Sequence, residues 1–92
     1  MSDKLKKKLA KALDRPFFLK ILRRAEQIAL DYQVILRYED GEYFGRGLEL
    51  PLAMGEGRTP GECLATTRKS MTLGVAVLLE QKKIPPRSAS DR

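Results

Sequence analysis

The chain of 92 residues contains no histidine and no tryptophan, and Cys63 is its single cysteine. Without histidine it lacks the commonest general base and the commonest zinc ligand, and Cys63 has no histidine to activate it as a nucleophile. One cysteine cannot form an internal disulfide, which fits a reducing compartment. These absences argue against an enzyme, and they predict neither a metal nor any other cofactor.

Long apolar runs are missing as well. No stretch of about 18 apolar residues is present to cross a membrane, and no continuous apolar segment follows the first lysines as in a signal peptide. The length suits one domain and not two independent cores. Apolar residues make up 42% of the chain and charged residues 33%, as in globular proteins. We therefore expect one globular, cytoplasmic domain.

The net charge of +6 is unevenly distributed. Residues 1–24 hold nine Lys or Arg and two Asp, whereas residues 25–92 hold nine basic and ten acidic residues. The basic N-terminal arm could contact nucleic-acid phosphates, an anionic membrane surface or an acidic partner, or it could be a solvated helix face. The lysines predicted to contact phosphate are Lys4, Lys6, Lys7, Lys8 and Lys11.

Apolar spacing predicts that residues 1–30 form a basic helical extension. Leu5, Leu9 and Leu13 fall on one helical face, and the Asp14-Arg15-Pro16 segment then interrupts that helix. Asp14 can cap a second helix with Pro16 in its first turn, and apolar residues recur at helical spacing from there to residue 30.

Alternating and β-branched residues then predict a meander of three strands. Residues 32–39 (YQVILRYE) form the first strand, and Asp40-Gly41 is the favoured two-residue hairpin turn. Residues 42–48 return antiparallel, with Gly45 and Gly47 marking a bulge or a close backbone approach. Residues 52–58 supply a third strand. Three aromatic residues are expected to brace the hairpin, namely Tyr38, Tyr43 and Phe44.

A long helix follows, because Thr59 can cap it, Pro60 suits its first turn and Glu62 completes a capping box. It should run to about Lys83 before Pro85-Pro86, with residues 87–92 as a disordered tail. Cys63, near its start, is predicted to be a packing residue. Residues 71–79 (MTLGVAVLL) are apolar on more than one face, so the N-terminal helix, a second copy or both bury them. The residues predicted for a homodimer interface are Met71, Val75, Leu78 and Leu79.

The predicted fold is therefore α+β: one or two N-terminal helices, a three-stranded antiparallel meander, and a long helix packed on the sheet. The order of its motifs resembles the N-terminal domain of the HicB antitoxin family. The matching segments are Tyr32 and Val34, Asp40-Gly41-Glu42-Tyr43, Glu49-Leu50-Pro51, residues 57–64 (GRTPGECL) and Ile84-Pro85-Pro86. The resemblance implies a partial ribonuclease H-like fold, with residues 31–86 as the HicB-like domain.

The resemblance also implies a function in a type II toxin–antitoxin system. A homo-oligomeric, non-enzymatic antitoxin would bind a small basic HicA-like toxin and cover its mRNA-cleaving site. The residues expected to bind this partner are Asp40, Gly41, Tyr43, Glu49, Leu50 and Pro51. The alternative is a homodimeric nucleic-acid-associated module that uses the basic arm. A third, remote reading is a metal-dependent nuclease built on Asp31, Glu39, Asp40, Glu42 and Glu49.

Overall fold

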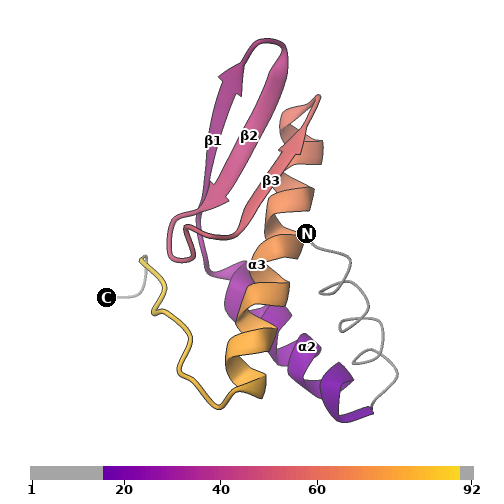
Figure 1. Ribbon diagram of the computed structural model, residues 1–92, viewed down its shortest axis with the longest axis vertical. Helices are drawn as coiled ribbons and strands as arrows, with labels where there is room; N and C mark the ends of the chain where they lie inside the picture. Colours follow the sequence, from indigo (N-terminus) through magenta and orange to yellow (C-terminus); the bar gives the residue numbers. More distant parts are fainter. Residues whose placement is uncertain (1–15, 90–92) are drawn as a thin grey trace.

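The computed structural model describes residues 16–89 of the chain. Its elements are α2 (Pro16–Leu30), β1 (Val34–Glu39), β2 (Glu42–Gly47), β3 (Met54–Gly57) and α3 (Pro60–Glu80). The strands form an antiparallel sheet in the order β1-β2-β3, and α3 packs on one side of it (Figure 1). The predicted α+β layout is confirmed. The predicted first helix, the Asp14 cap and the five phosphate-contacting lysines lie outside the described residues.

The hairpin between β1 and β2 has the predicted turn. Asp40 and Gly41 have φ angles of 52° and 83°, and positive φ at both central residues defines the turn type that suits the twist of a hairpin. The strand register runs without interruption from Glu39↔Glu42 to Val34↔Gly47. No bulge occurs along this stretch, so the glycines of β2 have another role.

That role is close contact between the sheet and α3. A Cβ atom on Gly45 would lie 2.4 Å from the Thr67 Oγ1 atom, and one on Gly55 would lie 2.5 Å from the Thr67 backbone nitrogen. At Gly57 the nearest atom would be the Cys63 backbone nitrogen, at 2.7 Å. Real Cβ atoms do not approach other atoms so closely. Glycines on this side of the sheet therefore let the backbone of α3 lie almost directly on the strands, and Cys63 is buried there as predicted.

The core lies where α2 crosses α3 below the sheet (Figure 1). Its buried members are Phe18, Ala25, Ala29, Tyr32, Ala53, Met71, Val75 and Ala76. Small alanines on α2 allow the two helices to approach closely. This packing explains why residues 71–79 are apolar on more than one face: one side meets the sheet and another meets α2.

The dimer-interface prediction is corrected by this packing. Met71 and Val75 are fully buried inside the chain and have no surface left for a second copy. Leu78 and Leu79 are only half-buried. Met71 and Val75 are thus buried by the sheet and the helical core of the same chain, with Met71 next to Gly47 of β2.

Several element boundaries also differ from the prediction. Tyr32 precedes β1, and its buried ring belongs to the helical core instead of the strand. Helix α3 ends at Glu80, three residues early, because Lys82 takes a left-handed conformation (φ 59°) and the Lys83 N–H closes the end on the Leu78 carbonyl at 2.8 Å. No helix of residues 16–89 is both long enough and apolar enough to cross a membrane.

Candidate functional site

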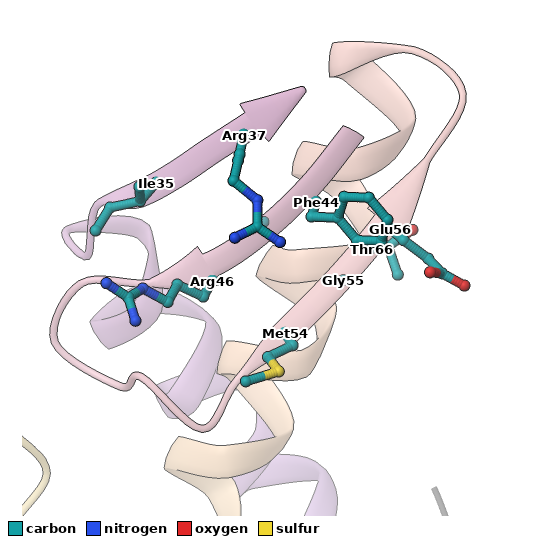
Figure 2. Close-up of a pocket in the computed structure, with 9 residues that line it drawn as sticks. Ile35, Arg37, Phe44, Arg46, Met54, Gly55, Glu56 and Thr66 are labelled. Carbon is teal, nitrogen blue, oxygen red and sulfur yellow. The ribbon is translucent and has the colours of Figure 1, made fainter. Parts of the chain in front are cut away.

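The two described helices lie on one side of the sheet and leave its other side uncovered. Side chains alternate along each strand, so every second residue points away from α3. Figure 2 shows these side chains standing on the sheet with the helices behind them. We call this surface the open face, and its side chains are Ile35, Arg37, Phe44, Arg46, Met54 and Glu56.

The strand register sets these side chains in two rows. One row holds Ile35, Arg46 and Met54, and the other holds Arg37, Phe44 and Glu56. Each row therefore mixes apolar and charged side chains, and the apolar ones occupy β1, β2 and β3 in turn. Together they line a shallow depression of about 690 Å³. Arg46 lies between Ile35 and Met54, and Phe44 lies between Arg37 and Glu56, so apolar and charged side chains alternate across the depression. Interfaces between proteins commonly combine apolar and charged side chains in this way.

The depression continues around the edge of β3. A second hollow of about 460 Å³ shares Met54 and Thr66 with the first, and it reaches Leu52 and Leu73. Met54 is 62% exposed and Leu52 is 93% exposed. The exposed apolar surface thus runs from the open face onto the outer side of α3.

Arg37 and Phe44 organise the centre of the open face. The Arg37 guanidinium lies 5.6 Å from the centroid of the Phe44 ring, a cation–π contact of roughly 0.5–1 kcal/mol at an exposed site. Arg37 also pairs with Glu39 at 3.2 Å. Because both side chains of that pair are well exposed, it contributes little stability, but it helps to hold the arginine above the ring.

The predicted partner-binding residues divide between opposite ends of the sheet. Asp40 and Gly41 form the exposed hairpin tip, with Tyr43 just below, where its ring packs 4.9 Å from that of Tyr38 as predicted. The Glu49-Leu50-Pro51 segment lies at the far end of β2 (Figure 1). The six residues therefore do not make one site.

Glu49 and Leu50 contact other parts of the same chain, so their role in the structure is to hold the fold together. Leu50 packs against the core. The Glu49 carboxylate accepts the backbone N–H of Gln33 at 2.9 Å and that of Ala89 at 2.8 Å. Tyr32 donates its hydroxyl to the Pro86 carbonyl, and Ser88 donates to the Asp31 carbonyl at 2.7 Å. The segment from Pro86 to Ala89 is thus fastened to the start of β1, and it includes Ser88 and Ala89 of the tail predicted over residues 87–92.

Two pKa values reflect this arrangement. Partial burial acts to raise the pKa of Glu49, but the N–H donors of Ala89 and Gln33 and the nearby Arg68 guanidinium outweigh it and lower the pKa below its ordinary value. Burial, together with the charge of Glu49, raises the pKa of the Tyr32 phenol. Glu49 is therefore a charged acceptor for backbone groups.

The carboxylates of the nuclease reading are not brought together. Asp31 and Glu49 lie near the start of β1, while Glu39, Asp40 and Glu42 lie at its other end, around the hairpin. Within residues 16–89 no group of three or more histidine, cysteine or acidic side chains is placed to hold a metal ion. The described residues thus show no assembled metal centre on these carboxylates.

Sequence reasoning missed most of the open face. Phe44 was expected only as a brace, and Ile35, Arg37, Arg46 and Met54 were not singled out. A signal was present in the alternation of β2, where Phe44 and Arg46 alternate with glycines. Since glycines on a strand mark the side where another backbone approaches, the residues between them point the other way.

Compared with known proteins, the chain matches no family model, no curated protein and no solved structure. The resemblance to the HicB antitoxins therefore rests on the motifs of the chain itself.

Proposed function

We propose that the protein is a non-enzymatic, cytoplasmic binding module that acts as a HicB-type antitoxin. It holds a small HicA-like toxin and covers the surface with which the toxin cleaves mRNA. The observation that supports binding is the open face, where exposed Ile35 and Met54 and half-buried Phe44 line one depression across three strands with no described helix over them. Exposed apolar surface rimmed by polar groups marks an interaction site. The partner class comes from the motif resemblance.

Charge at the hairpin end of the sheet suits such a partner. A ribonuclease toxin must bind anionic RNA, so its active surface is basic. Glu56 on the open face and Glu39, Asp40 and Glu42 around the hairpin offer carboxylates to that surface. The apolar side chains of the depression supply contact area, and the carboxylates at the hairpin end, beyond Arg37 and Arg46, supply orientation and a faster encounter.

The test uses the product of the neighbouring reading frame. If that product is a short basic protein that stops growth when expressed alone, co-expression of this chain should restore growth, and the two purified proteins should form a complex. Met54→Lys on the open face should weaken the complex about tenfold or more, because hot spots lie in the apolar centre of an interface. Leu30→Lys, which alters a 69% exposed leucine on α2, is the matched control. Equal effects of the two changes would rule out the open face.

Nucleic-acid binding is the second candidate, and Arg37 above Phe44 favours it. Sheets that bind single-stranded RNA use exposed aromatic rings and arginines in this way. We expect only weak, non-specific binding that depends mainly on the basic arm, with log K falling by about 0.9 per neutralised phosphate per log unit of salt.

Deletion of residues 1–13 separates the two candidates, because it removes Lys4, Lys6, Lys7, Lys8 and Lys11. Nucleic-acid binding should disappear with the arm, while toxin binding through the open face should stay nearly unchanged. Electrophoretic mobility shift and calorimetric titration measure the two activities. Loss of toxin binding on deletion would place the toxin site on the arm.

A further inference from the structure

Strand β1 has an unpaired outer edge. Glu39 and Glu42 flank the two-residue turn, and a hydrogen bond of 2.8 Å joins the Leu48 N–H to the Gln33 carbonyl at the other end. Hydrogen-bonded pairs alternate along an antiparallel ladder, so the odd-numbered residues of β1 bond to β2. The N–H and C=O groups of Val34, Leu36 and Tyr38 consequently point outward.

Nothing in the described chain occupies this edge. Within residues 16–89, no backbone hydrogen bond outside the sheet involves these three residues. Strand β1 (VILRYE) contains no proline, no lysine and no bulge, and its charged residues Arg37 and Glu39 pair with each other on the open face. Leu36 is 40% exposed and Tyr38 is 63% exposed, since α3 covers β2 and β3 more fully than β1. The edge therefore offers both hydrogen-bonding groups and apolar area.

We propose that this edge binds a second copy of the chain. Two β1 strands pair antiparallel about a two-fold axis at Leu36, and the two sheets join into one sheet of six strands. This interface replaces the predicted one at Met71 and Val75. It is independent of the proposed antitoxin function, and it leaves the open face of each copy uncovered.

The outward residues select both the partner and the register. With Leu36 opposite its symmetry mate, Val34 lies opposite Tyr38 of the other copy, so all three outward residues are paired through roughly six backbone hydrogen bonds. If one β1 strand slid by two residues relative to the other, Arg37 of one copy would lie opposite Arg37 of the other. If it slid by two residues the other way, Tyr38 would lie opposite Tyr32 of the other copy, which is buried and bonded to Pro86. Only the centred register avoids both, and it is self-complementary as a two-fold interface requires.

Side chains and charges agree with this arrangement. On the helix side of the joined sheet, the exposed Leu36 and Tyr38 of one copy meet Leu36 and Val34 of the other, which buries apolar surface. The antiparallel direction separates the two acidic hairpins. Each hairpin lies instead beside the start of the partner strand, where Arg68 lies near Asp31 and Glu49.

Cysteine cross-linking tests the axis directly. Opposite residues of a hydrogen-bonded antiparallel pair have Cα atoms about 5.5 Å apart, within the range that a disulfide spans. Leu36→Cys should therefore form a disulfide-linked dimer on mild oxidation. The native Cys63 is fully buried and should remain unlinked, and Leu52→Cys, at a 93% exposed site away from the axis, is the control. Equal or absent cross-linking of the Leu36 and Leu52 variants would overturn the interface.

Light scattering tests the assembly without a cross-link. The full chain should have a dimer mass at high micromolar concentration, and a monomer mass there would refute the proposal. Leu36→Lys places two like charges on the axis and should raise the dimer dissociation constant at least about tenfold, while Leu52→Lys should not.

Leu36 also packs near Gly45, so circular dichroism must confirm that the Leu36→Lys variant is folded. If it is not, Tyr38→Lys alters a more exposed residue of the same edge and should give the same loss. Folded edge variants that dimerise as tightly as the wild type would contradict the proposal. None of these outcomes depends on whether a toxin exists.

Discussion

At the scale of single residues, the absence of side chains at three strand positions decides how close α3 lies to the sheet. Gly45, Gly55 and Gly57 all turn their missing Cβ atoms toward the first turns of α3. Thr67 and Cys63 fill the space above them and are fully buried. The larger side chains that alternate with these glycines along β2 and β3 point to the open face. This part of the sheet therefore carries large side chains mainly on that side.

We predict that Gly55→Ala destabilises the protein by about 1–3 kcal/mol, the usual cost of overpacking. The new methyl group would lie 2.5 Å from the backbone nitrogen of Thr67, and a helix backbone cannot move aside as a flexible side chain can. Gly61→Ala is the control, because a Cβ atom there has no neighbour within 4 Å and alanine favours a helix. Urea unfolding measures both variants. An equally stable Gly55→Ala protein would mean that α3 does not lie this close to β3.

At the scale of elements, α3 shows which local signals can be read from a sequence. The Glu62 N–H donates to the Thr59 hydroxyl at 3.1 Å, and the Glu62 carboxylate accepts the Arg58 N–H at 3.2 Å. The capping box is therefore present, although the Glu62 carboxylate accepts the N–H of Arg58, the residue before the cap, and not that of Thr59. Every partner lies within four residues, so local chemistry determines where this helix begins.

The predicted cost of losing this cap is about 1 kcal/mol for Thr59→Ala, because the Glu62 N–H loses its acceptor. Thr66→Ala is a matched change on the same helix. Its hydroxyl only adds a second bond to a Glu62 carbonyl, so its loss should be nearly neutral. Chemical denaturation followed by circular dichroism compares the two. Equal losses of stability would show that the cap has no special role.

At the scale of the whole molecule, Glu49 joins parts of the chain that lie far apart in sequence. Its carboxylate binds the backbone of Gln33 before β1 and of Ala89 near the end of the described chain. Arg68 of α3 reaches the carbonyls of Ala29 and Tyr32 beside it, at 3.1 and 3.3 Å. The Glu49-Leu50-Pro51 segment is thus a junction that fastens the C-terminal segment to the sheet.

This junction should make stability depend on pH. The pKa of Glu49 is lower in the folded state than its ordinary value of 4.5, so the stabilisation is complete above 4.5 and is lost as the pH falls through the lower folded value. Glu49→Gln removes this titration and leaves the other carboxylates unchanged. The stability difference between wild type and Glu49→Gln should therefore be constant near neutral pH and shrink under acid conditions. A difference that does not vary with pH would show that the carboxylate charge is not what holds the segment.

The sequence by itself determined the features that depend on neighbours along the chain. Asp40-Gly41 specified the hairpin, Thr59 and Glu62 specified the start of α3, and Pro85-Pro86 excluded a longer helix. Turn geometry, capping and proline sterics act over a few residues, so the α+β order of elements could be predicted. For Gly45 the sequence left a bulge and a close backbone approach open, and the uninterrupted register and the contact with Thr67 decided for the close approach.

Only the tertiary structure decided which faces are buried. Met71 and Val75 could have met α2, a second copy or both, and the packing of α3 against the sheet and α2 buried them inside the chain. Tyr32 and Glu49 gained their roles from Pro86 and Ala89, 54 and 40 residues away. The open face and the free edge of β1 exist because the described helices cover only the other side of the sheet. The glycine alternation of β2 could indicate which side chains point away from the helix, but whether another segment covers them depends on packing between distant parts of the chain.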